Sequence, residues 1–482
     1  MSPAALLEVA DALDAAHVLF TLIRGDTSAP VLAIDAVDRA ATFRALANAF
    51  ADAPFYVEAI PATSGAALVS LGTLGTDPSS DVFRLFRADD TLSPLAPAEV
   101  QIEFWRLDVD TITLPRPNAH TRVTLPRSEA IATTVERYGR SWPTLDGMFS
   151  DLATDLPFDI DLVYSWVETA GTAWETARAQ RMTGYQIGEG DDSDARYRQV
   201  DELKYALRSV QQFAPWVHHI FIVTDSDKPD WLTEHPQVTL VRSEEFFADP
   251  SVLPTHNSHA VESQLHRIPG LAEHFLYSND DMFFGRPVAP SMFFSPGGVT
   301  KFIQSSTRIG FGDTTLSRSG FENAARVNRR LLQQRFGRTI ARHLEHAPTP
   351  LRTSVLFELE REFPEDFART AASPFRSATD ISVTNSLYHY YALLTGRAVV
   401  ETGARVGYID TTARSGLTEM AELLATRSMD FFCLNDGSFA EVTAADRAEA
   451  LTRFLESYFP APGPWENPDN RLDTQIPLSA LN

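Results

Sequence analysis

Short apolar segments that end in acidic residues constrain the fold of this 482-residue chain more than any other feature. Residues 219–225 read His-Ile-Phe-Ile-Val-Thr-Asp, and residues 274–281 read His-Phe-Leu-Tyr-Ser-Asn-Asp-Asp. A helical pattern over 197–213 precedes the first segment, and another apolar run, 238–242, lies between the two. Strands that alternate with helices in this way predict a parallel α/β sheet. Ligands of such sheets bind at the carboxyl ends of the strands, which is where these acidic residues would lie.

The triplet Asn279-Asp280-Asp281 is followed at once by Met282 and Phe283. Two adjacent carboxylates in apolar surroundings repel each other and lose hydration, unless a cation or hydrogen-bond donors compensate. Oxygen-rich clusters of this kind suit Mg²⁺ or Mn²⁺, which usually serve phosphates. An Asx turn that closes the strand is the alternative interpretation, because Asn and Asp are ordinary turn residues. The segment alone leaves both interpretations open.

The composition limits the class of protein. Apolar residues make up 44% and charged residues 22% of the chain, which is typical of a globular protein. The net charge of −23 argues against a general nucleic-acid binder. An anionic substrate remains compatible with it, because a local arginine pocket or a metal can reverse the field. The single cysteine, Cys433, excludes an internal disulfide, and its apolar neighbours indicate a buried core thiol.

The sequence contains no run of 18 apolar residues, so it predicts no membrane-spanning helix. The first twenty residues carry acidic side chains and lack a basic region, which is unlike a secretory signal. We therefore expect a cytoplasmic protein. Peripheral contact with the inner face of a membrane and the oligomeric state stay open.

The chain divides by composition into four parts. Residues 1–125 alternate helix and strand patterns and predict a small α/β or α+β accessory domain of unknown role. Residues 126–157 are predicted to be a connector, 158–440 the catalytic domain, and 441–482 a C-terminal helix and tail. Within the catalytic part, residues 169–195 are rich in Gly and Asp and predict a loop.

A predicted helix that ends before Pro269 carries His259, Glu262 and His266. Residues three or four apart share a helix face, so Glu262 lies on the same face as both histidines. This spacing could bind zinc, although no further strong ligand set is evident. A solvated charged face is the alternative interpretation.

Further candidate residues lie in two later segments and one earlier strand. His346 precedes Ala-Pro, in a context that favours extended or turn geometry and leaves the imidazole free to point into a cleft. Arg352 and Arg376 flank predicted helix starts, where anions are bound readily. Residues 431–437 repeat the pattern of an apolar strand that runs into Asn-Asp. The strand 159–167 contains Asp and Trp residues, and an edge strand with a core Trp would also explain it.

The segments DIDLVYSWV, RYRQVDELKYALRSV, FIVTDSDKPDWL, NSHAVESQLHRIPGLAEHFLYSNDDMFFG, HAPTPLR and FFCLND occur in this order. Together they resemble the four conserved regions of the Stealth family of sugar-phosphate transferases. The resemblance covers residues 158–440. That family includes bacterial capsule polymerases and the catalytic subunit of the lysosomal-enzyme N-acetylglucosamine-1-phosphotransferase.

The resemblance implies a glycosyltransferase-A-like α/β core that uses Mg²⁺ or Mn²⁺. Its implied reaction moves hexose 1-phosphate from a UDP-sugar (a UDP-HexNAc such as UDP-GlcNAc) to a hydroxyl of a glycan or polymer acceptor. The products would be a phosphodiester and UMP, in bacterial capsule or cell-wall polymer synthesis. Carried over by position, the implied catalytic residues are His346, Arg376 and Glu262. The implied substrate-binding residues are Asp161, Trp166, Asn257, Ser258, Asn279, Arg352 and Asn435. The implied metal ligands are Asp281, Asp436 and Asp280.

Three other functions stay open at this point. A metal-dependent glycosyltransferase would share the fold and the metal but release UDP, so the released nucleotide separates it from a phosphotransferase. A noncatalytic glycan-binding protein is the second alternative. A zinc hydrolase built on His259 and His266 is the third.

Overall fold

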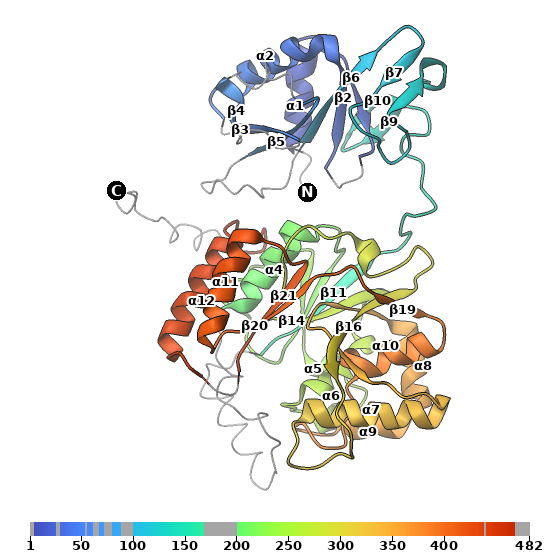
Figure 1. The fold of residues 1–482 in the computed structure, drawn as a ribbon, viewed down its shortest axis with the longest axis vertical. Helices are drawn as coiled ribbons and strands as arrows, with labels where there is room; N and C mark the ends of the chain where they lie inside the picture. The colour runs from blue at the N-terminus through green and yellow to red at the C-terminus, as the bar shows by residue number, and fades with distance from the viewer. Residues whose placement is uncertain are drawn as a thin grey trace. The chain divides into compact units, whose positions relative to one another are not determined.

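The structure is a computed structural model that describes residues 4–25, 29–53, 55–60, 67–71, 80–87, 100–167, 200–437 and 440–467. The chain forms two compact units, Met1–Leu152 and Ala153–Asn482 (Figure 1). The predicted loop over 169–195 and the end of the predicted tail lie outside the described residues.

The first unit is built on one mixed sheet with the strand order β1-β2-β6-β5-β3-β4. Its helices are α1 (Ala4–Ala15) and α2 (Arg39–Ala49). The strands of the sheet are β1 (Phe20–Ile23), β2 (Val31–Asp35), β3 (Phe55–Ala59), β4 (Ala67–Leu68), β5 (Val82–Arg87) and β6 (Val100–Leu107), extended by β7 (Thr111–Thr113) and β8 (Thr124–Pro126). Phe43 of α2 packs against Phe83 and Phe104 of the sheet, with ring centroids 5.1 and 5.8 Å away. This is the small domain with helices and strands that the sequence predicts, and it is of the α+β type.

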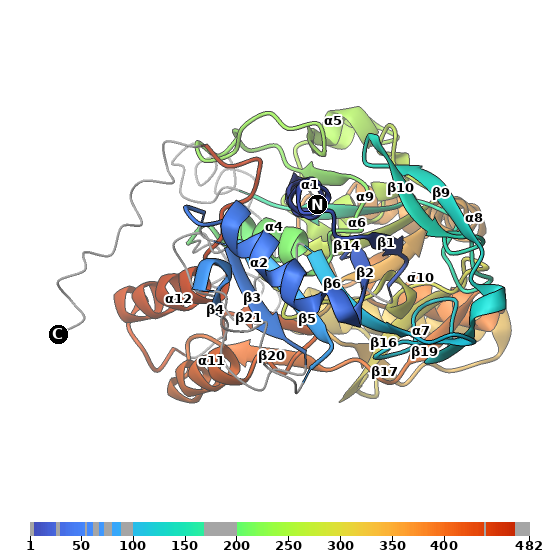
Figure 2. The ribbon, with the colours of Figure 1, turned by 90° about the horizontal axis from the view of Figure 1, so that it is seen from above.

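The first unit extends beyond its predicted end at residue 125. Strands β9 (Ala132–Arg137) and β10 (Arg140–Leu145) form an antiparallel hairpin in the region predicted to be a connector (Figure 2). Tyr138 and Gly139 close it with φ angles of 52° and 73°, as a two-residue hairpin turn requires. Trp142 of β10 is fully buried in the core of the unit. The connector prediction is therefore wrong as far as Leu152, because this hairpin supplies part of the core.

The second unit contains a central five-stranded sheet with the order β13-β12-β11-β14-β18. Its strands are β11 (Ile160–Ser165), β12 (Ile220–Val223), β13 (Val238–Val241), β14 (His274–Asn279) and β18 (Thr349–Arg352). The first four strands in this order are parallel, and β18 runs antiparallel to β14. The predicted α/β class with a mostly parallel sheet is confirmed.

Both faces of the central sheet are buried, because successive side chains of a strand point to opposite faces. Leu162 and Leu276 enter one core, and Val163 and Phe275 enter the other. The first core is covered by α4 (Glu202–Phe213), α11 (Arg414–Thr426) and α12 (Ala444–Tyr458). The second core is covered by α5 (Ser243–Phe246), α6 (Ser258–Glu262), α7 (Gly320–Phe336), α8 (Thr353–Glu362), α9 (Pro364–Ala371) and α10 (Tyr388–Leu394). Figure 1 shows the two helix groups on opposite sides of the sheet.

Two three-stranded sheets complete the second unit. One has the order β15-β21-β20, from β15 (Met282–Phe284), β21 (Phe431–Asn435) and β20 (Val406–Asp410). The other has the order β17-β16-β19, from β17 (Arg342–Leu344), β16 (Thr300–Arg308) and β19 (Ala398–Glu401). None of the helices that the structure describes is long and apolar enough to span a membrane.

Helix α12 belongs to the second unit and is not a separate C-terminal element. Its residues Leu451, Phe454 and Tyr458 are buried in the same core as the central sheet. The predicted domain end at residue 440 is therefore too early.

A buried ion pair fixes the segment that follows α12. Arg208 of α4 donates from Nε and Nη2 to the two carboxylate oxygens of Glu466, each at 2.6 Å, and from Nη1 to the Phe459 carbonyl at 2.8 Å. The two side chains are only 9% and 3% exposed. We expect Glu466→Ala to lower the free energy of unfolding by about 3–5 kcal/mol, because it leaves a buried guanidinium without its carboxylate. Urea unfolding of the purified protein measures this.

The exposed pair Arg453–Glu449 on α12 provides the control, because its side chains are 73% and 70% exposed. Glu449→Ala should change the free energy of unfolding by less than about 0.5 kcal/mol. Equal changes in the free energy of unfolding for Glu466→Ala and Glu449→Ala would contradict the larger stabilisation expected from the buried pair.

Candidate active site

The candidate site is centred on the turn between β14 and β15. Ser165 at the end of β11 lies opposite Asn279 at the end of the parallel strand β14, so both strands end at this edge of the sheet. Asp280 and Asp281 form the turn, and the Asp281 carbonyl accepts a hydrogen bond from the Leu434 amide of β21 at 3.0 Å. The turn thus joins the central sheet to the sheet β15-β21-β20. This is the carboxyl edge at which the sequence predicts a ligand site.

The carboxylates at this turn repel one another. Burial raises the pKa of Asp280 well above its usual range, and the charges of Asp281 and Glu202 raise it further. Burial also raises the pKa of Glu202, on α4, to about 6, with Asp281 adding to the rise. A divalent cation would relieve this repulsion, and carboxylate oxygens are the ligands that Mg²⁺ and Mn²⁺ prefer. The donor chemistry of Asp280 and Asp281 therefore fits the predicted metal.

Asp436, the third predicted metal ligand, takes part in an internal ion pair. Its Oδ1 accepts from the Arg447 guanidinium of α12 and from the Thr411 hydroxyl, the latter at 2.7 Å. Both charged side chains are 5% exposed, and Arg447 also lies 4.0 Å from Glu202. Within the described ranges, no group of three or more His, Cys, Asp or Glu side chains has the geometry of a metal site. The metal role of Asp436 stays a prediction, and Oδ1 is already used by the protein.

His346 lies in the bend between β17 and β18 and is half-buried. Its ring centroid is 5.0 Å from that of Tyr408 on β20. The Tyr408 hydroxyl accepts a hydrogen bond from the side-chain amide of Asn435, and the charge of Asp281 acts on the same phenol. The structure therefore connects the predicted base, His346, with the predicted substrate residue Asn435 and the carboxylate turn.

Arg376, Ser258 and Glu262 form a second group of predicted site residues, and the side chain of Arg376 packs against Gly320 of α7. Arg376 donates from Nη2 to the Ser258 hydroxyl at 2.7 Å. Glu262 is 3% exposed and accepts hydrogen bonds from the hydroxyls of Thr384, at 2.7 Å, and Tyr277, at 3.5 Å. Burial raises the pKa of Tyr277, and the charges of Glu262, Arg376 and Asp280 all act on it. Tyr277 is two residues before Asn279, so these groups face the same end of the strand.

Two predicted substrate residues lie at the opposite end of the sheet. Asp161 is 1% exposed. Its Oδ2 accepts a hydrogen bond from the Ala272 amide at 2.8 Å, and its Oδ1 lies 2.9 Å from Nδ1 of His218. Arg352 lies opposite His274 at the start of β14, where its Nε donates to Glu273 at 2.9 Å. The six-residue strand β14 separates this end from Asn279 by about 17 Å. Asp161 and Arg352 therefore lie away from the carboxylate turn, and their substrate roles stay predictions.

Trp166 packs in the core near the site, and Asn257 makes hydrogen bonds that hold the helix and loop beside it. Trp166 follows β11 and is 5% exposed within the main core, as the alternative interpretation holds. Asn257 is 1% exposed and caps α6 through the His259 amide at 3.1 Å. Its Nδ2 donates to Asp380 at 2.8 Å and also bonds carbonyl oxygens of the segment before Arg376. Asn257 therefore positions the segment before Arg376, and substrate contact by Trp166 and Asn257 stays a prediction.

The predicted helix with two histidines and Glu262 is not continuous. Helix α6 ends at Glu262, and a separate 3-10 turn, Leu265–Arg267, follows it. His266 pairs with Glu360 of α8 at 3.0 Å, whereas His259 lies 3.8 Å from Asp380. The two histidines therefore point to different partners, and the shared face predicted for Glu262 and His266 is wrong.

Sequence reasoning missed Glu202, Tyr408 and Arg447. The sequence could have indicated Glu202, because this residue lies on the helix face that buries Tyr205, Ala206 and Ser209. An acid on the buried face of an amphipathic helix needs a partner or a ligand. Tyr408 and Arg447 lie in segments with no motif of their own, so only the packing of β20 and α12 reveals them.

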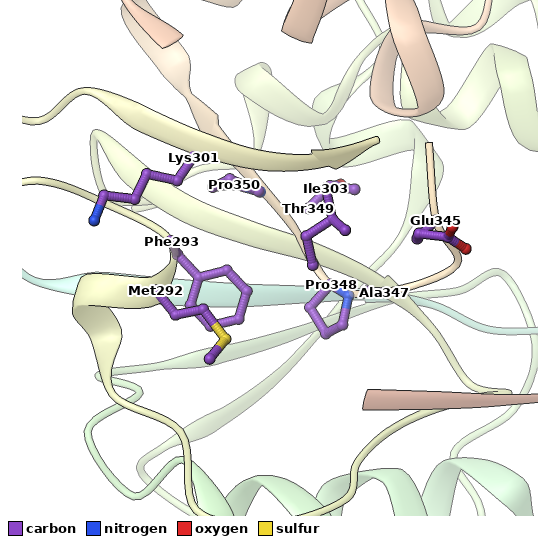
Figure 3. A pocket seen from close by; sticks show the side chains of 9 residues that line it. All are labelled: Met292, Phe293, Lys301, Ile303, Glu345, Ala347, Pro348, Thr349 and Pro350. Carbon is purple, nitrogen blue, oxygen red and sulfur yellow. The ribbon is translucent and has the colours of Figure 1, made fainter. Parts of the chain in front are cut away.

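The loop that carries His346 also lines a small hollow of about 270 Å³, including the solvent space at its mouth. Its walls are mostly apolar, and Figure 3 shows Met292 and Phe293 opposite Pro348. The ammonium group of Lys301 bonds the Ser291 carbonyl at 2.7 Å and points away from these side chains (Figure 3). The hollow is thus an apolar neighbour of the His346 bend and not the centre of the polar site.

Three conserved regions of the Stealth proteins match this chain. Conserved region 2 matches residues 196–302, conserved region 3 matches 345–393, and conserved region 4 matches 421–476. His346, Arg376 and the carboxylates at the β14 end lie within these regions, whereas Tyr408 lies between the second and third of the matches. Two solved structures are also similar to the chain, both at low scores. The galactosyltransferase LgtC, in complex with donor and acceptor sugar analogs, is 9% identical with a TM-score of 0.31, over 62% of this chain and 95% of that one. The bifunctional glycosyltransferase WbbM is 10% identical with a TM-score of 0.33, over 66% of this chain and 53% of that one.

Curated relatives are similar over almost the whole length of the chain. The exopolysaccharide phosphotransferase CpsY of Mycobacterium tuberculosis (strain H37Rv) is 57% identical over 461 residues, which are 94% of this chain and 86% of that protein. An exopolysaccharide phosphotransferase of Nocardia farcinica is 54% identical over 455 residues, 94% of this chain and 85% of the relative. The exopolysaccharide phosphotransferase SCO6023 of Streptomyces coelicolor is 39% identical over 490 residues, 95% of this chain and 81% of the relative. The chain belongs to the Stealth family.

Proposed function

We propose that this protein transfers hexose 1-phosphate from a UDP-sugar, with GlcNAc 1-phosphate as the first candidate, to a hydroxyl group of a glycan acceptor. The product is a sugar phosphodiester, and the leaving group is UMP. The names of its relatives, exopolysaccharide phosphotransferases, support a role in the synthesis of a bacterial polysaccharide. One observation carries the proposal: a histidine and a turn of two carboxylates are linked through Tyr408 and Asn435.

The chemistry assigned to His346 is proton removal from the acceptor. The acceptor hydroxyl loses its proton to the imidazole as its oxygen attacks the β-phosphorus of the donor. A phosphorus–oxygen bond forms there, and the bond from the β-phosphorus to the oxygen bridging it to the α-phosphate breaks. The electron pair leaves with UMP, and the sugar stays on the transferred phosphate. A neutral imidazole is a suitable proton acceptor for such a step.

The remaining residues stabilise the negative charge of the transferred phosphoryl group. Arg376, held by the Ser258 hydroxyl, is assigned to the non-bridging oxygens, because a guanidinium matches the geometry of phosphate. Asp280 and Asp281 would hold Mg²⁺ or Mn²⁺, which supplies positive charge to the diphosphate when bound. Glu262 anchors Thr384 and Tyr277 beside Arg376, so we assign it a positioning role.

The released nucleotide tests the proposal. Incubation with UDP-GlcNAc, Mn²⁺ and a series of oligosaccharide acceptors should release UMP in proportion to a phosphodiester product detected by mass spectrometry. Release of UDP with a glycosidic product would instead make the protein an ordinary glycosyltransferase. Other UDP-sugars belong in the same assay. The absence of any product with all of them would favour the glycan-binding alternative.

A further inference from the structure

A strongly basic segment precedes the candidate base His346. Residues 308–342 contain eight arginines and two acidic residues, in a chain whose net charge is −23. Most of this segment is helix α7 and the loop before it. The exposed tip of the loop, Phe311, is 95% exposed. A concentration of positive charge in a chain whose net charge is negative indicates an anionic partner.

Three of these arginines, the arginine cluster Arg318, Arg326 and Arg329, meet at the loop Gly310–Gly312. Arg329 donates from Nη2 to the Gly310 carbonyl at 3.1 Å. A Cβ atom on Gly310 would lie only 2.5 Å from Nη2 of Arg326, and one on Gly312 would lie 3.7 Å from Nη2 of Arg318. Gly310 therefore lets the backbone lie directly against the Arg326 guanidinium, whereas Gly312 is only in ordinary contact distance of Arg318.

The donors of this cluster are only partly satisfied by the protein. Arg326 is 6% exposed, and its Nη1 donates to the Glu322 carbonyl at 2.8 Å. Nε of Arg326 and Nε of Arg318 are buried and have no acceptor in the part of the chain that the structure describes. Burial and the neighbouring charges of Arg318 and Arg329 lower the pKa of Arg326. Buried charges with unused donors are unfavourable, and an anion that accepts from them removes that penalty.

The arginine cluster lies next to the candidate site. Phe321 of α7 stacks on His343, with ring centroids 4.5 Å apart, and lies 6.4 Å from the ring of His346. The charge of Arg326 and that of His346 both act on His343. His346 thus lies between two aromatic side chains. Tyr408 on one side accepts a hydrogen bond from Asn435, near the carboxylate turn, and Phe321 on the other belongs to the helix that carries Arg326 and Arg329.

We propose that the arginine cluster binds a phosphate group of the acceptor, namely a phosphodiester in a glycan chain that already carries transferred units. This inference rests on the proposed function. Arg376 and the carboxylate turn are assigned to the donor, and the side chain of Arg376 packs against Gly320, two residues after Arg318. The cluster therefore adjoins both the donor groups and the group that activates the acceptor hydroxyl, where a phosphate next to that hydroxyl would lie. Each transfer adds a negative charge to the glycan, and a protein of net charge −23 would repel such a chain without a local positive site.

The test compares two acceptors and two variants. The acceptors are a neutral oligosaccharide and the same oligosaccharide carrying one phosphodiester. Arg318→Gln should lower the ratio of kcat/KM for the phosphodiester acceptor to kcat/KM for the neutral one by about tenfold or more, as expected for a lost charged hydrogen bond. Arg330→Gln removes the same charge from the exposed face of α7 and should leave the ratio unchanged. Calorimetric binding of the phosphodiester oligosaccharide without donor provides a second measurement that needs no turnover.

Three outcomes would overturn the inference. A raised KM for UDP-GlcNAc in Arg318→Gln with an unchanged acceptor ratio would assign the cluster to the donor. Loss of binding to phosphatidylglycerol vesicles, with glycan binding intact, would assign it to a membrane surface. Equal effects of Arg318→Gln and Arg330→Gln would reduce the cluster to general surface charge. A protein that releases UDP but keeps the discrimination between acceptors would refute the proposed function and retain the anion site.

Discussion

His346→Ala should lower kcat by about 10²- to 10⁴-fold, the usual contribution of a general base, with donor affinity unchanged. The imidazole lies in a bend between two strands and is half-buried, so its removal leaves the sheet and its cores intact. Its ring contacts are to Tyr408 and Phe321, and the groups assigned to the donor are separate from it. Steady-state rates of UMP release give kcat, and calorimetry with UDP-GlcNAc gives donor affinity.

His219→Ala is the matched control, because His219 lies at the amino end of β12, where its Nε2 bonds Thr239 at 2.9 Å. This variant should retain full activity. If His346→Ala loses donor affinity together with turnover, the imidazole is a binding group and another base must be sought. If kcat falls less than tenfold, proton removal by His346 is not the main contribution.

The position of a site residue could be predicted where the sequence of a single strand was enough to place it. Residues 274–281 predict a buried strand with a carboxylate turn at its end, and β14 with its turn matches this. The same holds for β21 and Asn435. These predictions need only the period of the strand and the rule that ligands meet parallel sheets at their carboxyl ends.

The position of a residue could not be predicted where it depends on the direction of a strand. Arg352 begins a helix and looks like an anion-binding residue from the sequence. Because β18 runs antiparallel to β14, Arg352 falls opposite His274, where it pairs with Glu273. The direction of β18 depends on long-range packing, which the local sequence does not contain.

The helical layer shows a second limit. The structure has a π-helix, Val383–Leu387, directly before α10. The π-helix contains Thr384, which donates to Glu262, and π-helical turns are frequent at functional sites. Apolar periodicity does not distinguish an inserted residue from a regular turn. A partner for Glu262 was therefore not predictable.

Asp281→Asn should weaken the dependence of activity on Mn²⁺, with the midpoint of the titration shifted to higher concentration by at least about tenfold. The substitution removes a charge that raises the pKa of both Asp280 and Glu202. The metal-free variant should therefore be more stable than the metal-free parent, because the repulsion among these carboxylates is relieved. In the parent, Mn²⁺ at 100 times its Kd should stabilise the fold by about 2.7 kcal/mol, and the variant should show much less of this at the same concentration.

The opposite signs of the two stability changes make this test specific. General damage to the fold would lower the melting temperature with and without metal, whereas loss of a ligand lowers only the metal-induced gain. Glu419→Gln removes one exposed charge from α11 in the same unit and should alter neither quantity. Thermal melts with and without Mn²⁺ give both numbers without any need for turnover. An unchanged Mn²⁺ titration in Asp281→Asn would refute the assignment of Asp281 as a metal ligand.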